Sequence, residues 1–339
     1  MNPACLGGFW PDLRQAACSE PGAAMPMPLA SGAAALIQLR GPALHPGAMA
    51  GSAGVRLERA RGGDTPVLTF VVDAPAGTVR LLLDTGAAAM LVTPALLQRL
   101  GLIPRPVAPG SFGLAGAGEG CRGLQPQRIR LPALRLRDSE GLGGPALRLS
   151  GAEALMLPVA GLPADVDGVL GAPQLRQLPV WIDPRSDRLA LGGKALEAQA
   201  PEAAATLRLR WRRGVPLLPL ALDRPRAAGS PVTTLVPALA DTGAEGLFVT
   251  PALAATLKAL APGRPLQVAG SCGQQPARAT QVLGPHLPGT GPAAPVQAIE
   301  TANPVFRALG VEAIVGQELL RSHRQLWRLD TNPPRLTLW

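Results

Sequence analysis

The sequence predicts an all-β protein made of two related lobes with approximate two-fold symmetry. Its 339 residues exceed the ~150 of an average domain. Gly (40) and Pro (38) are abundant, and because both residues interrupt helices, this composition favours short strands and turns. The stretch from Asp84 to Leu100 agrees with the stretch from Asp241 to Leu257 at ten of 17 positions. One long repeat of this kind indicates a unit that occurs twice.

The first unit, residues 63–191, opens with two expected strands. Residues 66–84 read as two apolar strands around a turn at residues 74–77, and the second strand ends at Asp84. A short helix is expected over residues 93–101, where a threonine can cap its start and a glycine can stop it.

The second unit, residues 207–339, repeats this order. Its Gly-containing segment, residues 269–279, corresponds to the Gly-rich residues 110–123 of the first unit. Residues 192–206 have the composition of a linker. Residues 1–62 show no sustained periodicity, so we expect them to form a poorly ordered leader.

Both copies of the repeat lead a buried strand into Asp-Thr-Gly, at Asp84 and at Asp241. Loops related by a two-fold axis can meet at that axis, which would bring the two carboxyl groups side by side. Such a pair combines a group that takes a proton with one that gives it. It can hydrolyse an amide through a water held between the two groups, without a metal or cofactor.

The residues that follow each aspartate suit a supporting role. Gly86 and Gly243 allow a sharp turn and leave room for water and substrate. Thr85 and Thr242 can send their hydroxyl groups across the axis to the backbone of the opposite loop.

Two Asp-Thr-Gly-Ala loops, each followed by two apolar residues and a glycine (Val169–Gly171 and Ile314–Gly316), resemble the aspartic proteases. That family's aspartate pair is the standard example of two carboxyls that share one proton. Each unit is similar to a retropepsin subunit, and the tandem resembles the bilobed pepsins. The resemblance implies two β-barrel lobes around a substrate cleft, with Asp84 and Asp241 as the catalytic residues.

The resemblance also implies that the two Gly-rich segments form flaps over the cleft. The glycines expected to act as flap or substrate-binding residues are Gly113, Gly116, Gly118 and Gly270. Two features depart from the pepsin pattern: Ala87 and Ala244 stand where Ser or Thr is usual, and the chain has no tyrosine for a flap. Glu245 is either a specificity residue or a solvated charge.

Other readings of the Gly-rich segments carry less weight. Gly118, Gly120 and Gly123 have the spacing of a dinucleotide loop, but the prolines and alternation that follow favour a flap hairpin. Cys121 and Cys272 lie in the two segments, and a disulfide between them would lock the cleft. Two unpaired thiols are the simpler interpretation, and we predict them.

Composition bears on partners and location. The net charge of +9 comes from scattered arginines without a nucleic-acid-binding motif, so we predict a solvated basic surface and no nucleic acid. Four cysteines and three histidines lack metal-ligand spacing, so no metal or cofactor is expected. No apolar run reaches ~18 residues, so no membrane span is expected. The Ala-Met-Ala at residues 48–50 leaves a periplasmic or secreted location open.

The sequence therefore predicts an aspartic endopeptidase that cleaves peptide or protein substrates. Monomeric action is expected, because both aspartates belong to one chain. The alternative is a catalytically weak or inactive peptide-binding module on the same scaffold.

Overall fold

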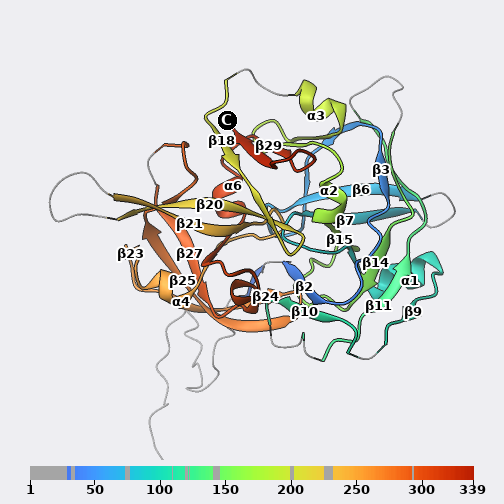
Figure 1. The fold of residues 1–339 in the computed structure, drawn as a ribbon, viewed down its shortest axis with the longest axis horizontal. Coiled ribbons are helices and arrows are strands. Elements are labelled where there is room, and N and C mark those ends of the chain that lie inside the picture. Colours follow the sequence, from blue (N-terminus) through green and yellow to red (C-terminus); the bar gives the residue numbers. More distant parts are fainter. Residues whose placement is uncertain are drawn as a thin grey trace, which may run out of the picture.

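The computed structural model describes most of the chain from residue 29 onward. The described residues are 29–31, 35–72, 77–108, 110–118, 121, 123–139, 146–198, 202–224, 232–291 and 294–339. Among them, strands dominate and the helices are short (Figure 1). The predicted fold class, all-β with two related lobes, is confirmed.

The N-terminal lobe is built on an eleven-stranded sheet. At its centre β6 (Pro66–Val72) runs antiparallel to β7 (Thr78–Asp84), and β7 pairs in parallel with β15 (Gly168–Gly171). On its other edge β15 runs antiparallel to β8 (Leu91–Val92). The last four residues of β7 are all buried, so the strand carries Asp84 into the interior.

The C-terminal lobe repeats this arrangement in a second eleven-stranded sheet. Here β20 (Val215–Arg224) runs antiparallel to β21 (Val232–Ala240), and β21 pairs in parallel with β28 (Ala313–Val315). Strand β22 (Leu247–Val249) runs antiparallel to β28. Each aspartate therefore sits at the end of a strand with an equivalent set of neighbours.

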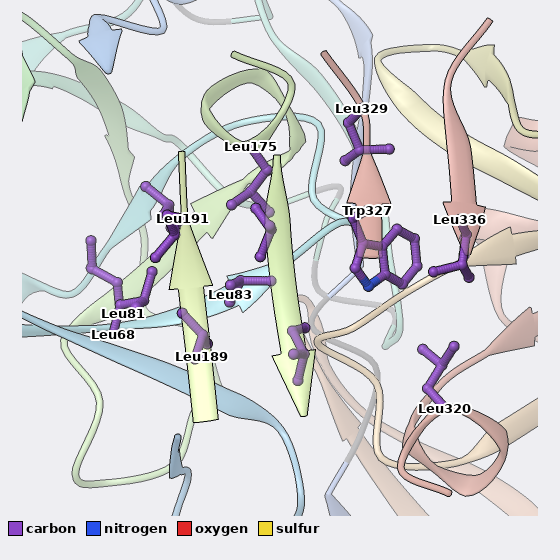
Figure 2. Packing of buried hydrophobic residues seen from close by; sticks show 14 of the residues in the cluster. Leu68, Leu81, Leu83, Leu175, Leu189, Leu191, Leu320, Trp327, Leu329 and Leu336 are labelled. Carbon is purple, nitrogen blue, oxygen red and sulfur yellow. The ribbon is translucent and has the colours of Figure 1, made fainter. Parts of the chain in front are cut away.

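A six-stranded sheet joins the two halves of the chain. Its order is β18 (Ala205–Arg208), β30 (Arg335–Leu338), β29 (Gln325–Arg328), β16 (Val180–Asp183), β17 (Arg188–Leu191) and β4 (Ala53–Arg56). The two halves meet where β16 pairs with β29. Figure 2 shows buried side chains in and around this sheet, with Leu81, Leu83 and Leu189 in the left part of the view and Trp327 and Leu336 in the right part.

The helices begin where the sequence provides caps. Thr93 Oγ1 accepts a hydrogen bond from the Leu96 N–H (3.2 Å), and Thr250 Oγ1 accepts one from the Leu253 N–H (3.1 Å). Gly101, with φ of +62°, ends the first helix. The helices are α1 (Pro94–Leu100), α2 (Ala172–Leu175), α3 (Gly193–Glu197), α4 (Pro251–Ala254), α5 (Pro304–Leu309) and α6 (Gln317–Leu320).

The remaining strands belong to the two large sheets, except for β2 and β10, which form a separate two-stranded sheet. They are β1 (Leu29–Ser31), β2 (Leu36–Arg40), β3 (Ala48–Ala50), β5 (Glu58–Arg59), β9 (Arg105–Pro106), β10 (Gly113–Gly116), β11 (Gln127–Arg130), β12 (Leu134–Leu136), β13 (Leu147–Ser150), β14 (Glu153–Met156), β19 (Arg210–Arg212), β23 (Lys258–Ala259), β24 (Arg264–Gly270), β25 (Gly273–Leu283), β26 (Pro285–His286) and β27 (Val296–Thr301).

The expectation of a poorly ordered leader over residues 1–62 is wrong for residues 35–62. This part contains β2 to β5, and β3 pairs with β13 while β4 pairs with β17. Strands of two to five residues are too short to show a period, and their partners lie far away in the sequence. The rest of the expected leader, apart from β1, lies outside the described residues.

Two further expectations need adjustment. The predicted linker, residues 192–206, contains α3, in which Ala195 is fully buried. The predicted turn at residues 74–77 lies outside the described residues except for Gly77. No helix in the described part of the chain is long and apolar enough to cross a membrane.

Truncating the core around the joining sheet should destabilise the whole molecule. Leu189 is fully buried in the cluster that spans both halves, so Leu189→Ala is expected to lower the free energy of unfolding by about 2–5 kcal/mol. Leu235→Ala, at a position that is 59% exposed, is the control and should change it by less than about 0.5 kcal/mol. Equal melting temperatures for the two variants would contradict this account of the core.

Candidate active site

Asp84 and Asp241 lie side by side where the two lobes meet. A methyl group added at Gly86 would collide with the Asp241 carboxylate, and one added at Gly243 would collide with the Asp84 carboxylate. Both aspartates are fully buried. The glycines are therefore required because each loop passes directly against the carboxyl group of the other lobe.

Each aspartate is held by its own loop through one oxygen. The Gly86 N–H donates to Asp84 Oδ1 (2.7 Å), and the Gly243 N–H donates to Asp241 Oδ1 (2.9 Å). No N–H or O–H group of the described residues donates to the Oδ2 atom of either aspartate. Since these two oxygens carry no donor, a proton on one carboxyl is the natural link between the pair.

Two threonines lock the loops together across the axis. The Thr85 N–H donates to Thr242 Oγ1 (3.0 Å), and the Thr242 N–H donates to Thr85 Oγ1 (3.1 Å). Each hydroxyl in turn donates to a carbonyl of the opposite lobe, Thr85 to Ala240 and Thr242 to Leu83, both at 2.6 Å. All four bonds are buried, so the two loops cannot move independently without leaving polar groups unpaired.

The apolar-apolar-Gly elements at the ends of β15 and β28 support these loops from beneath. The Ala172 N–H donates to the Ala87 carbonyl (2.9 Å), and the Gln317 N–H donates to the Ala244 carbonyl (2.8 Å). A side chain at Gly171 would collide with the Ala87 backbone. The repeat of these tripeptides in the sequence thus reflects close backbone contact with each aspartate loop.

Gln317 is a supporting residue that the sequence analysis missed. Its side-chain amide donates to the Thr242 carbonyl (2.7 Å), and the residue is buried. The equivalent residue of the first lobe is Ala172, which has no such group. Because the repeat offers no second copy of this contact, no sequence signal distinguished Gln317.

The environment of the pair favours protonation. Burial raises the pKa of Asp84 to about 6, against smaller lowering effects from hydrogen bonds with Asp241, Gly86 and Ala87. Burial, followed by the charge of Asp84, raises the pKa of Asp241 well above the usual carboxyl range. Both shifts favour the protonated form of a carboxyl group, and the two groups titrate as a pair.

The two Gly-rich segments meet each other. The Cys272 N–H donates to the Ala117 carbonyl (2.8 Å), and the Gly118 N–H donates to Gln275 Oε1 (3.0 Å). Side chains added at Gly116, Gly118 or Gly270 would collide with the opposite segment. The fourth glycine, Gly113, lies instead against the side chain of Arg40.

A disulfide links Cys121 and Cys272, whose Cα atoms are 4.8 Å apart. The prediction of two unpaired thiols is therefore wrong. The cysteines are 151 residues apart and lie in different lobes. Their proximity depends on how the lobes dock, so the pairing could not be predicted from their spacing in the sequence.

Glu245 also differs from both expectations. Its carboxylate accepts hydrogen bonds from the Asp64 N–H (2.8 Å), the Thr65 N–H (3.0 Å) and the Thr65 hydroxyl. The residue is partly buried and ties the loop of the second lobe to the first. Among the described residues, no group of three or more His, Cys, Asp or Glu side chains could hold a metal ion.

Comparison with known families agrees with this geometry. Residues 71–173, which include Asp84 and the closing element of its lobe, match the family model for aspartyl proteases. This part of the chain is therefore similar to the aspartyl proteases. With a second Asp-Thr-Gly loop at Asp241 in the same chain, the protein resembles this family's retropepsin-like members in a tandem form.

Two solved plant structures are similar in outline. Conglutin gamma, a basic 7S globulin from lupine seeds, aligns with a TM-score of 0.49, and the basic 7S globulin from soybean with 0.46. Each pair is 12% identical, and each alignment covers 85% of this chain and 94% of the globulin. Similarity at this level carries no information about activity. No significant match was found among curated proteins.

The buried aspartates should make stability depend on pH. Because the folded pKa of Asp84 lies above its unfolded value of 3.8, the folded state binds the proton more tightly, and stability should fall as pH rises from about 4 to about 6. In Asp84→Asn this fall should be reduced. The measurement is the melting temperature of both proteins from pH 4 to 7, and parallel curves would contradict the assignment.

The disulfide is directly testable. Proteolysis without reductant should release a linked pair of peptides that contain Cys121 and Cys272, and reduction should separate them. Cys272→Ser is expected to cost about 2–4 kcal/mol of stability, because the bond closes a long loop. Mass spectrometry that finds both peptides unlinked in the native protein would refute the pairing.

Proposed function

We propose that this protein is an aspartic endopeptidase in which Asp84 and Asp241 activate a water molecule. The observation that carries the proposal is the pair of buried carboxyl groups whose Oδ2 atoms have no donor, held by symmetric threonine bonds. A buried carboxyl pair is costly to fold, so its retention together with the full supporting set favours a chemical role. The match of residues 71–173 to the aspartyl protease model supports the same class of activity.

In the proposed reaction the ionised carboxyl of the pair takes a proton from water as the water oxygen attacks the peptide carbonyl carbon. The protonated carboxyl donates to the carbonyl oxygen and so stabilises the tetrahedral intermediate. A proton then passes from the pair to the amide nitrogen, and the C–N bond breaks. The pair titrates as a unit, so neither aspartate is assigned a fixed role.

The preformed geometry explains why this pair would be effective. The carboxyl planes are fixed by the Gly86 and Gly243 N–H groups, and the loops are fixed by Thr85 and Thr242. A site that is already organised loses little free energy to rearrangement during the reaction. Ala87 and Ala244 supply no hydroxyl to the aspartates, which leaves burial as the dominant influence on their pKa.

The proposed substrate is an extended peptide that adds a strand between the Gly-rich segments and the aspartate loops. Gly116, Gly118 and Gly270 would shape the roof of this cleft, and Gly113 its outer end. We infer that the two lobes arose by duplication and act within one monomer, because each supplies one aspartate. Residues 63–191 and 207–339 are proposed as the cores of the two lobes.

The second candidate is a peptide-binding module without catalysis on the same scaffold. The complete burial of both aspartates favours it, because water and substrate need access to the pair. A binding module would keep its affinity for peptides when either aspartate is replaced, whereas an endopeptidase would lose turnover.

Peptide cleavage distinguishes the two candidates. Asp84→Asn and Asp241→Asn should each lower kcat by at least about a thousandfold on a peptide library at pH 4 to 7, since one carboxyl cannot perform both proton transfers. Asp330→Asn, on the exposed surface, is the matched control and should retain activity. Cleavage that survives both active-site substitutions would rule out the proposed mechanism.

A further inference from the structure

A cavity of about 580 Å³ lies beside the loop that carries Asp84. Part of its wall is formed by residues 88–90, which follow directly after the Asp-Thr-Gly-Ala of the first lobe. The charged residues of the wall are Arg40, Arg176 and Arg213, and no Asp or Glu of the described residues belongs to it. The cavity therefore presents three positive charges to a ligand and no negative charge.

Two of these arginines are positioned by packing contacts. Arg40 ends β2, and a Cβ atom added at Gly113 would lie 2.8 Å from Arg40 Cγ, so the arginine side chain covers this glycine. Arg176 follows α2, and its guanidinium carbon lies 5.2 Å from the centroid of the Trp211 ring. A cation over the face of a tryptophan is attracted by the ring. Both side chains are thus held at the cavity by contacts that leave their charge intact.

The third arginine, Arg213, has a backbone conformation that arginine rarely adopts. It forms a two-residue turn with Gly214 between β19 and β20, with φ of +47° at Arg213 and +81° at Gly214. Such turns favour asparagine, aspartate or glycine, because a larger side chain strains the left-handed backbone. Arg213 Nε donates to the Ala308 carbonyl (3.0 Å), which holds the side chain in place. The fold therefore tolerates strain that places an arginine at the cavity.

The positive charge of the cavity is not neutralised by the protein itself. Within the part of the chain that the structure describes, no carboxylate forms an ion pair with Arg40, Arg176 or Arg213. Arg80, by contrast, pairs with Asp165 at 3.2 Å in the same lobe. Three guanidinium groups gathered around one cavity without a counter-charge favour an anionic ligand, and a carboxylate matches their planar donor geometry.

Gln174 adds a buried hydrogen-bond acceptor to the same wall. The residue is 1% exposed, and its Nε2 donates to the Pro46 carbonyl (3.1 Å), which fixes the orientation of the amide. Its Oε1 atom accepts no hydrogen bond from the described residues. A buried acceptor without a donor costs free energy, so this oxygen is suited to accept an N–H group of a ligand in the cavity.

We propose that this cavity binds a carboxylate of a peptide, which the three arginines hold while Gln174 Oε1 accepts a hydrogen bond from a peptide N–H. The inference rests on the proposed function in that the ligand is a peptide. It adds a substrate class: peptides with a negative charge a few residues from the cleaved bond, because the cavity wall includes Ala88, close after Asp84 in the chain. The carboxylate can belong to an acidic side chain or to a peptide C-terminus, since both present the same group.

The test is peptide binding to the full chain with Asp241→Asn, in which cleavage cannot consume the probe and the Asp84 loop beside the cavity is unchanged. The probes are short peptides of one apolar sequence with a neutral fluorophore at the N-terminus. The neutral probe has an amidated C-terminus and no charge. The side-chain probe is amidated and contains glutamates, and the terminal probe has a free C-terminus and no acidic side chain.

Fluorescence anisotropy should show that at least one carboxylate probe binds at least about tenfold tighter than the neutral probe, because charge-assisted hydrogen bonds to guanidinium groups strengthen the contact. Tighter binding of the side-chain probe or of the terminal probe identifies the source of the carboxylate, and either result supports the proposal. Equal affinities for all of the probes would overturn it.

Paired substitutions separate the cavity from the general positive charge of the protein. Arg176→Gln together with Arg213→Gln should reduce the preference for the carboxylate probe at least about fivefold. Arg208→Gln together with Arg210→Gln, at exposed positions of β18 and β19 outside the cavity wall, removes the same net charge and should keep the preference. An equal reduction in both double variants would overturn the site.

Further variants guard against misfolding, with the melting temperature of each measured alongside binding. Arg176→Lys together with Arg213→Lys keeps both charges without the planar donor group, so it should retain part of the preference. Arg40→Gln tests the cavity from a different element and should also reduce the preference. A folded lysine variant that loses the preference as completely as the glutamine variant would overturn the proposal, as would an unchanged preference in folded Arg40→Gln.

Cleavage by the chain with both aspartates separates this inference from the proposed function. Carboxylate-dependent binding without cleavage of any probe would retain the site and overturn the endopeptidase. Cleavage of the neutral and carboxylate probes with equal kcat/KM, together with equal affinities, would retain the endopeptidase and overturn the site.

Discussion

The close approach of two buried carboxyl groups is the constraint on which this structure depends. Burying Asp84 and Asp241 without solvent disfavours their charged forms and raises the pKa of both, so the surrounding structure has to hold two carboxyl groups together at a cost in free energy. The reciprocal bonds of Thr85 and Thr242 provide that geometry. The need for glycine at 86 and 243, and the close packing of the elements beneath each loop, follow from the same contact.

The lobes are joined at several levels around this contact. The six-stranded sheet pairs β16 with β29 across the two halves, Glu245 binds the backbone at Asp64 and Thr65, and the disulfide links the Gly-rich segments above. The proposed two-fold active site requires this rigidity, because a small shift between lobes would separate the carboxyl groups.

Much of the fold and the centre of the candidate site could be predicted because their signals are local. The threonine caps of α1 and α4, the strands that end at each aspartate, and the Asp-Thr-Gly repeat all lie within short stretches of sequence. The errors concern contacts between distant segments. Residues 36–40 seemed unstructured because their partners, at residues 87–88 and 113–116, lie elsewhere in the chain. Cys121 with Cys272, and Glu245 with Thr65, were missed for the same reason.

The sequence by itself determined the chemistry available to this protein: two identical loops, each with one carboxyl group, one hydroxyl group and a glycine, in an all-β chain. Those properties depend only on residue type and local spacing, and both can be read directly from the sequence. Only the tertiary structure decided that the carboxyl groups are buried and adjacent, that the two Gly-rich segments are joined, and that β2 lies beside the Asp84 loop. These outcomes depend on how the two lobes dock. Docking depends on the packing of many side chains that are far apart in the sequence, so it cannot be predicted from any short stretch of it.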